Sequence, residues 1–233
     1  MTPPETTPEA APDPPADAVF EAVAELMRAQ AAQRRLRNDP VDDATVLALI
    51  ELGAHANRGR RRRCSFVVVR DPDVRHQLAR TYRQGWSVYK RVLRSRWSDD
   101  ALLEDRQWQS DHFEDVPVLV VACLPGRRPL FPAIGAAAFY GTAFPAVQNL
   151  LLAAAARGLG ASATTLPLWS VWESRRTLGL PRNVTPVSVV ALGWPRGSLH
   201  ALPGGPPAPF VGNVVHLDRW GHQPFRAGRA SGA

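Results

Sequence analysis

Arginine side chains are the most prominent candidates for a binding role in this sequence. They occupy position 58 and positions 60–63, and a second group stands at Arg28, Arg34, Arg35 and Arg37. A guanidinium group donates hydrogen bonds in a fork that matches phosphate and carboxylate. The cluster at 58–63 is open to three interpretations: an exposed basic loop, an anion site, or a patch for a polyanion, although no aromatic residues interleave it for base stacking. The second group is either a binding element or the solvated end of a helix.

The histidines do not form a metal-binding pattern. His55, His76 and His112 are scattered, and His216 and His222 lack partner ligands at a recognisable spacing. The sequence therefore predicts no metal centre.

Several other patterns carry no catalytic signal. Gly158-x-Gly160 follows a predicted helix and precedes a predicted strand, the reverse of the order in a dinucleotide-binding fingerprint. Asp105 and its acidic neighbours are interpreted as acids on the surface of a helix. Cys64 and Cys123 each lie in an apolar strand-like run without C-x-x-C spacing, so we expect buried, reduced thiols.

The stretch 139–166 must form the centre of the structure that positions these side chains. Pro145 suits the first turn of a helix, and the following run to Ala156 is apolar almost all round, which is typical of a helix buried on every side. It is shorter than the roughly 20 residues that a membrane span needs. Arg157 and Gly158 end the helix, and the small residues 161–166 predict a core strand.

The remaining elements follow from periodicity and from turn residues. Asp17 is predicted to cap a helix from 18 towards 33, and Asp42 or Asp43 to cap a second helix that ends at Gly53. Further elements are predicted as strands at 64–69, 116–124 and 187–192, helices at 74–89 and 173–178, and a short apolar arm at 210–217. Residues 90–113 are less periodic.

Length and composition favour one α/β-containing domain. The chain has 233 residues, 45% of them hydrophobic, with a predicted disordered tail at 1–16, a domain at 17–222 and a flexible tail at 223–233. The net charge of +7 fits either polyanion binding or an arginine-rich solvated surface, since Lys90 is the only lysine. Without an N-terminal basic region followed by an apolar one, we expect a cytoplasmic protein.

Two stretches resemble the nitroreductase family of flavoproteins. PAVQNLLLAAAARGLGASATTL (145–166) is similar to the family's central helix and following strand, and ESRRTLGLPRNVTPVSVVALGWPRG (173–197) to its short helix, "LGLP" turn and last core strand. With DVPVLVVACL and VVHLDRWG, the resemblance covers roughly 18–222. It implies an α+β fold with a mostly antiparallel sheet flanked by helices, and a homodimer with FMN at its interface.

The resemblance also implies which residues hold the flavin. The family's Arg-x-Ser-x-Arg motif maps onto QAAQRRLRNDPV, with Arg34 at the last basic position; a three-residue insertion would instead bring Arg28 to the first position. The family's P-S-x-x-N-x-Q-P-W loop maps onto ANRGRRRRC, where Asn57 replaces Ser, Arg60 replaces Asn and Arg62 replaces Gln. Arginine only donates hydrogen bonds, so a backbone carbonyl would have to accept from the flavin N3–H.

Two further positions complete the implied site. Thr164, Thr165 and Leu166 stand where the family's backbone reaches the ring near N5, or are simply strand-end residues. Arg219, in VVHLDRWG, is a phosphate candidate or an arginine in a surface ion pair. Because the reacting atom belongs to the flavin, no catalytic side chain is required.

The resemblance implies an FMN-dependent oxidoreductase that passes electrons from NAD(P)H to a nitroaromatic, quinone or similar small acceptor. The altered loop and the missing Arg-x-Ser pattern favour an alternative, a protein of the same fold that has lost flavin catalysis and acts in binding. Nucleic-acid binding is a weaker third hypothesis, and we expect no membrane partner. The sequence does not distinguish NADH from NADPH or identify the acceptor.

Overall fold

In the computed structural model, the described residues are 16–56, 64–94, 100–129, 133–197 and 214–223. The chain divides into a main unit, Met1–Leu202, and a C-terminal unit, Pro203–Ala233. Asn57, the arginine cluster at 58–63, most of the predicted N-terminal tail and residues 210–213 of the apolar arm therefore lie outside the described residues.

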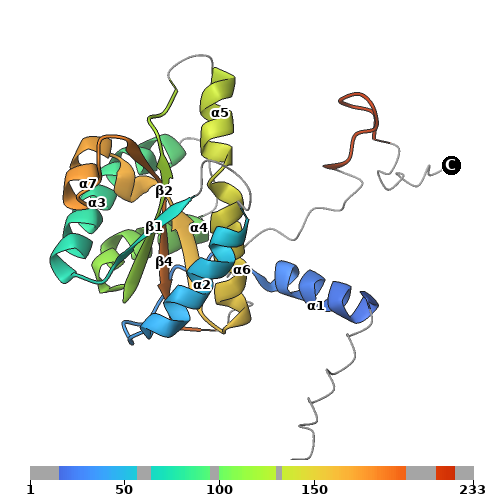
Figure 1. The fold of residues 1–233 in the computed structure, drawn as a ribbon, viewed down its shortest axis with the longest axis horizontal. Helices are drawn as coiled ribbons and strands as arrows, with labels where there is room; N and C mark the ends of the chain where they lie inside the picture. Colours follow the sequence, from blue (N-terminus) through green and yellow to red (C-terminus); the bar gives the residue numbers. More distant parts are fainter. Residues whose placement is uncertain (1–15, 57–63, 95–99, 130–132, 198–213, 224–233) are drawn as a thin grey trace, which may run out of the picture. The chain divides into compact units, whose positions relative to one another are not determined.

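The main unit alternates helices with strands (Figure 1). Its elements are α1 (Ala16–Ala29), α2 (Asp43–His55), β1 (Ser65–Val69), α3 (Pro72–Arg94), α4 (Asp100–Asp111), η1 (Phe113–Asp115), β2 (Val118–Pro125), α5 (Ala133–Gly141), α6 (Phe144–Ala156), β3 (Gly160–Thr164), η2 (Leu166–Leu168), α7 (Val171–Thr177) and β4 (Val184–Gly193).

The four strands form one antiparallel sheet in the order β1-β2-β4-β3. β2 and β4 occupy the centre and are buried along nearly their whole length, as their continuous apolar runs predict. The β2–β4 register shifts between Ala122 and Cys123. The predicted α+β architecture with a mostly antiparallel sheet is confirmed.

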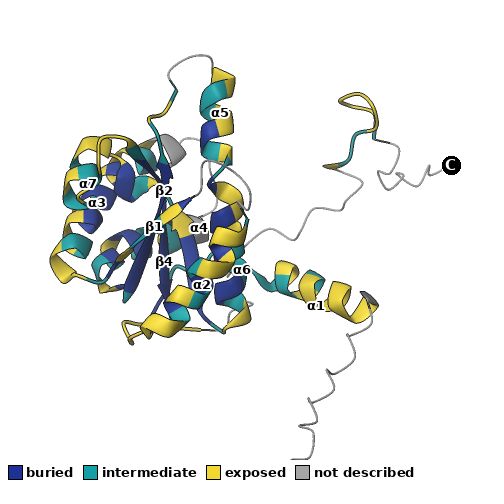
Figure 2. Cartoon of the chain, in the orientation of Figure 1, coloured by how far each residue is buried: buried dark blue, intermediate teal, exposed yellow. Residues whose placement is uncertain are grey.

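Helices cover both faces of the sheet, each over its own apolar core. One core joins α2 and α6 to side chains such as Val120 and Val190, and the other joins α3, α4 and η2 to Leu119 and Val189. Figure 2 shows the inner strands buried and most of α1 exposed.

Most predicted helices form, with shifted ends. Asp42 caps α2 as expected, since its carboxylate accepts from the Thr45 N–H at 2.8 Å. α2 nevertheless runs past Gly53 to His55: a Cβ at Gly53 would lie 3.1 Å from the Ala146 carbonyl oxygen, so this glycine serves close packing against α6 rather than termination. Asp17 lies in the first turn of α1 rather than before it, and Ala16, assigned to the tail, begins the helix.

α6 begins and ends as predicted, but it is not buried on every side. Pro145 lies in its first turn, and Gly158 after it adopts φ +74°. Ala146, Leu150 and Ala154 are fully buried, whereas Phe144 is 52% exposed. One face of this apolar helix is thus only partly covered by its own chain.

The described part of the C-terminal unit is short and irregular. Within residues 214–223, the His216 ring stacks on Trp220 with centroids 4.1 Å apart, and Asp218 has a positive φ of 59°. Among all described residues, no helix combines the length and apolar character needed to cross a bilayer.

Candidate active site

The end of β3 presents small side chains to a cavity. Ala163 and Thr165 are exposed, and Thr164 and Leu166 are half-buried, whereas the residues of η2 that follow, Pro167 and Leu168, are buried anchors. The Thr164 hydroxyl accepts from the Leu166 N–H at 3.3 Å, which turns the chain out of the strand.

This cavity has a volume of about 310 Å³ and is lined by residues from α3, α4, α6, η2, the edge strand β3 and the central strand β4. Its lining residues are Tyr89, Arg106, Phe144, Ala163, Thr164, Thr165, Leu166 and Ser188. The Ser188 hydroxyl donates to the Thr164 carbonyl at 3.4 Å and links β4 to the strand end. We call this the strand-end cavity. The three strand-end residues predicted from the sequence all line it.

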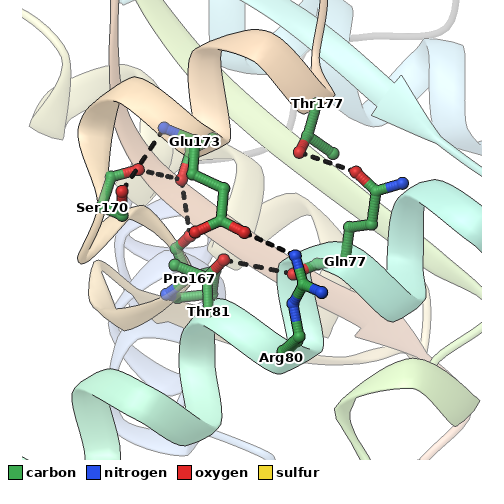
Figure 3. A network of polar contacts seen from close by, with 8 residues as sticks. Gln77, Arg80, Thr81, Pro167, Ser170, Glu173 and Thr177 are labelled. Atoms are coloured by element: carbon green, nitrogen blue, oxygen red, sulfur yellow. Dashed lines mark hydrogen bonds and ion pairs between the residues drawn. The ribbon is translucent and has the colours of Figure 1, made fainter.

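A polar network between α3 and α7 holds η2 in place (Figure 3). The Ser174 hydroxyl of α7 donates to the Pro167 carbonyl at 2.9 Å, and Arg80 of α3 pairs with Glu173 at 2.6 Å. Thr177 donates to Gln77 at 3.0 Å. α3 and α7 therefore fix the segment that carries Leu166.

Arg34 lies in an extended segment that runs beside the sheet. The Gln33 N–H donates to the Ala161 carbonyl at 2.9 Å, and Leu36 forms a bridge with Pro195. A Cβ at Gly160 would lie 2.7 Å from Leu36 Cδ2, so this glycine permits the close approach.

Arg34 pairs with Asp105 of α4, which corrects the interpretation of Asp105 as a surface acid. Their side chains are only 13% and 19% exposed, and Arg34 Nη1 lies 3.0 Å from Asp105 Oδ2. Arg35 contacts the other carboxylate oxygen at 3.3 Å. Asp105 therefore neutralises part of the positive charge of this segment.

Tyr82 connects these charges to the strand end. It is 2% exposed, and its hydroxyl donates to Gln109 Oε1 at 3.2 Å. Burial raises the pKa of Tyr82 to about 12, while the charge of Arg34, the Thr164 hydroxyl and the charge of Arg106 act against this rise. Arg34 and Arg106 thus both act electrostatically on Tyr82, which stays protonated at neutral pH.

Of the other predicted site residues, Arg28 is the one that lies among the described residues of the main unit, and it does not line the strand-end cavity. Arg28 lies on α1, 3.7 Å from Glu21, with both side chains about 70% exposed. Asn57, Arg60 and Arg62 lie outside the described residues. Arg219 is exposed in the C-terminal unit, whose position relative to the main unit is not described.

Sequence reasoning missed Arg106, Tyr89, Phe144 and Ser188 as lining residues. Arg106 and Tyr89 come from segments without a motif, so only the packing of α3 on α4 reveals them. Phe144 offered one signal, a large aromatic residue directly before the helix-starting Pro145.

The cysteines and acidic residues offer no alternative chemistry. Cys64 and Cys123 are buried and free, and burial raises the pKa of Cys64 to about 11 and that of Cys123 to about 12, so neither is a ready nucleophile. No group of three or more metal-binding side chains occurs within the described ranges.

Comparison with known proteins agrees with this architecture. The model of the nitroreductase family matches residues 27–194. A protein of Methanothermobacter thermautotrophicus named as an NADH dehydrogenase/NAD(P)H nitroreductase is 33% identical over 109 residues, which are 46% of this chain and 52% of that protein. The chain thus matches about half the length of this curated relative.

Solved structures share the fold at lower identity. NADPH:FMN oxidoreductase from Vibrio harveyi, solved with NAD⁺, is 21% identical with a TM-score of 0.60, over 84% of this chain and 77% of that one. A protein described as a nitroreductase, in complex with FMN, from Desulfovibrio desulfuricans is 21% identical with a TM-score of 0.59, over 85% of this chain and 97% of that one. With the family model matching most of the chain, this protein belongs to the nitroreductase family.

Proposed function

We propose that this protein is a flavin-dependent oxidoreductase that uses FMN to pass electrons from NAD(P)H to a small acceptor such as a nitroaromatic or a quinone. The observation that carries the proposal is the strand-end cavity, where small side chains meet the positive charge of Arg106, which directly follows Asp105, the partner of Arg34. Neighbours of the same fold include an NADPH:FMN oxidoreductase and a protein in complex with FMN, which supports this choice of cofactor.

The residues around the cavity fit the ring of FMN. Ala163, Thr164 and Thr165 are small enough to let a planar ring approach the backbone, and Tyr89 and Phe144 supply aromatic walls. FMN, when bound, supplies the atom that accepts hydride and later donates electrons. Positive charge close to such a ring stabilises its reduced, anionic form.

The proposed roles follow from charge and position. Arg106, together with Arg34, which acts on the same Tyr82, would stabilise negative charge, and Thr165 and Leu166 would lie against the ring. Arg28, Asn57, Arg60, Arg62 and Arg219 remain candidates for the phosphate and the ring edge. A homodimer would complete the site, because α1 and α6 leave apolar surface exposed on the single chain.

The first test is the flavin content of the purified protein. We expect a yellow protein that releases FMN on denaturation, oxidises NAD(P)H in the presence of a quinone or nitroaromatic, and follows ping-pong kinetics. A colourless protein that takes up no FMN when incubated with it would contradict the proposal.

One observation favours a second candidate, a family member that binds partners without flavin catalysis. Asp105 engages Arg34 at 3.0 Å, so this cation already has a structural partner. FMN titration distinguishes the two candidates: saturable binding with quenching of flavin fluorescence favours the enzyme, and its absence favours the binding protein.

A further inference from the structure

A second cavity, of about 920 Å³, is lined by four arginines. Arg127 and Arg128 follow β2, Arg175 belongs to α7, and Arg182 lies in the turn before β4. We call this the arginine cavity. Its volume is within the range of about 300–1,000 Å³ that is typical of small-molecule sites.

Among the described residues, no acidic side chain balances the positive charge of this cavity. No carboxylate lines it, and none of the four arginines forms an ion pair within the described part of the chain. Like charges that converge on a concave surface raise the local potential and attract anions. The planar guanidinium fork selects phosphate in particular.

The two loops that carry these arginines are tied together, which distinguishes the cavity from a set of independent surface side chains. Gly126 turns the chain with φ +103°, and its N–H donates to the Asn183 carbonyl at 2.5 Å. The Thr185 hydroxyl donates to the Gly126 carbonyl at 2.8 Å. Arg175 donates to the carbonyls of Pro181 and Val184 and so fixes the loop that carries Arg182.

The arginine cavity adjoins the strand-end cavity. Ser188 of β4 lines the strand-end cavity, and Thr185 of the same strand lines the arginine cavity, a separation of roughly 10 Å at about 3.3 Å per strand residue. Phe144 lines the first cavity, and Tyr140, four residues earlier, lines the second. One elongated ligand can therefore reach both.

We infer that the arginine cavity binds the 2′-phosphate end of the nicotinamide donor, so that the protein uses NADPH in preference to NADH. This inference rests on the proposed function. Arg127, Arg128 and Arg182 contact the phosphate, and the half-buried ring of Tyr140 offers a face for the adenine. The dihydronicotinamide end of the same molecule then enters the strand-end cavity.

The test removes the charges without removing the loop anchor. The variant R127Q/R128Q/R182Q retains Arg175, and the matched control is R176Q, because Arg176 stands next to Arg175 on α7 but packs on Trp172 at 4.9 Å instead of lining the cavity. Binding of adenosine 2′,5′-bisphosphate is measured by calorimetry, together with KM for NADPH and NADH. We expect the triple variant to bind the bisphosphate at least about tenfold more weakly, since each charge-assisted hydrogen bond contributes roughly that factor.

The kinetic readout separates this inference from the proposed function. KM for NADPH should rise in the triple variant, while kcat and the KM for NADH stay unchanged, and the far-ultraviolet circular dichroism should match the wild type.

Equal use of both donors by the wild type, or unchanged bisphosphate binding by the triple variant, overturns the inference even when the flavin is reduced normally. Arginine-dependent bisphosphate binding by a protein without flavin supports the phosphate site and rejects only the proposed function. Displacement of the bisphosphate by duplex DNA at equimolar phosphate overturns the inference in favour of a polyanion patch.

Discussion

Asp105 sets how much positive charge reaches the candidate active site. Its carboxylate contacts both Arg34 and Arg35, and it is the nearest counter-charge to a guanidinium group that is only 13% exposed. A charge this far from water depends on its partner. Asp105 therefore has a structural role in keeping Arg34 in the extended segment beside β3.

Replacing Asp105 with Asn should lower the free energy of unfolding by about 3 kcal/mol, because it leaves Arg34 largely buried without a counter-charge. Urea denaturation measures this change. Glu104→Gln is the matched control: Glu104 is the adjacent residue of the same helix and is exposed, so its replacement should change stability by less than about 0.5 kcal/mol. Equal effects of the two variants would show that the ion pair has no special role.

The two arginines proposed for the ring-facing role can be separated by replacement. Arg34→Gln should weaken FMN binding by about tenfold or more, since it removes a charge proposed to stabilise the ring, whereas Arg28→Gln, at an exposed position of α1, should weaken it less. Fluorescence titration with FMN measures both. The double variant R34Q/D105N, which removes both charges of the pair, controls for loss of folding. A larger loss of FMN binding in Arg28→Gln than in Arg34→Gln would reverse the assignment.

At the scale of elements, the site depends on how closely the segment before α2 packs against β3. Gly160 leaves space for the Leu36 side chain. The backbone hydrogen bond from Gln33 to Ala161 fixes the position of Arg34 along β3. The arginine and the cavity are thus aligned by a contact that involves no charged group.

Gly160→Val should destabilise the protein by about 2 kcal/mol and weaken FMN binding, because the added side chain displaces Leu36 and with it the extended segment. Thermal unfolding and FMN titration measure the two effects. Ser65→Val, at an exposed position of β1, is a control that adds similar bulk to a strand. Unchanged FMN binding in a destabilised Gly160→Val protein would show that the segment does not position the site.

The sequence predicts single helices and strands better than it predicts which of them pack against one another. The Asp42 cap, the start of α6 at Pro145 and the buried runs of β2 and β4 follow from local chemistry, and all are found. The end of α2 was misplaced because Gly53 is needed for packing rather than for a turn. The bounds of α4 were not predicted, although Asp105 and its neighbours were expected on a helix, since its polar sequence carries little apolar periodicity.

The part of the candidate site that consecutive residues form was predictable from the sequence. The part that depends on contacts between distant segments was not. Thr164, Thr165 and Leu166 are consecutive, so locating the strand end located all three. Arg106 and the partnership of Arg34 with Asp105 depend on which face of α4 meets the segment at 30–37, and no spacing within either segment contains that information.

At the scale of the whole molecule, apolar side chains on α1 remain in contact with water. Val19, Phe20, Val23 and Met27 are 46%, 66%, 45% and 58% exposed, which is unusual for one amphipathic face. Phe144 of α6, which lines the strand-end cavity, is likewise 52% exposed in the single chain. Both features support the proposed homodimer.

Phe20→Asp combined with Met27→Asp should therefore shift the protein from dimer to monomer, because two charges would have to enter an apolar interface. Sedimentation velocity across a tenfold concentration range measures the change. Glu25→Ala, at an exposed polar position of the same helix, should leave the dimer intact. A wild-type protein that sediments as a monomer at all concentrations would contradict the proposal.

The position of β1 at the edge of the sheet has a practical consequence for handling this protein. One row of its peptide groups has no ladder partner among the described residues, and Val68 is 37% exposed. Such a rim can recruit strands from other molecules and seed insoluble aggregates during concentration. Val68→Lys should delay the rise in static light scattering on storage, and an unchanged time course would place the origin of aggregation elsewhere.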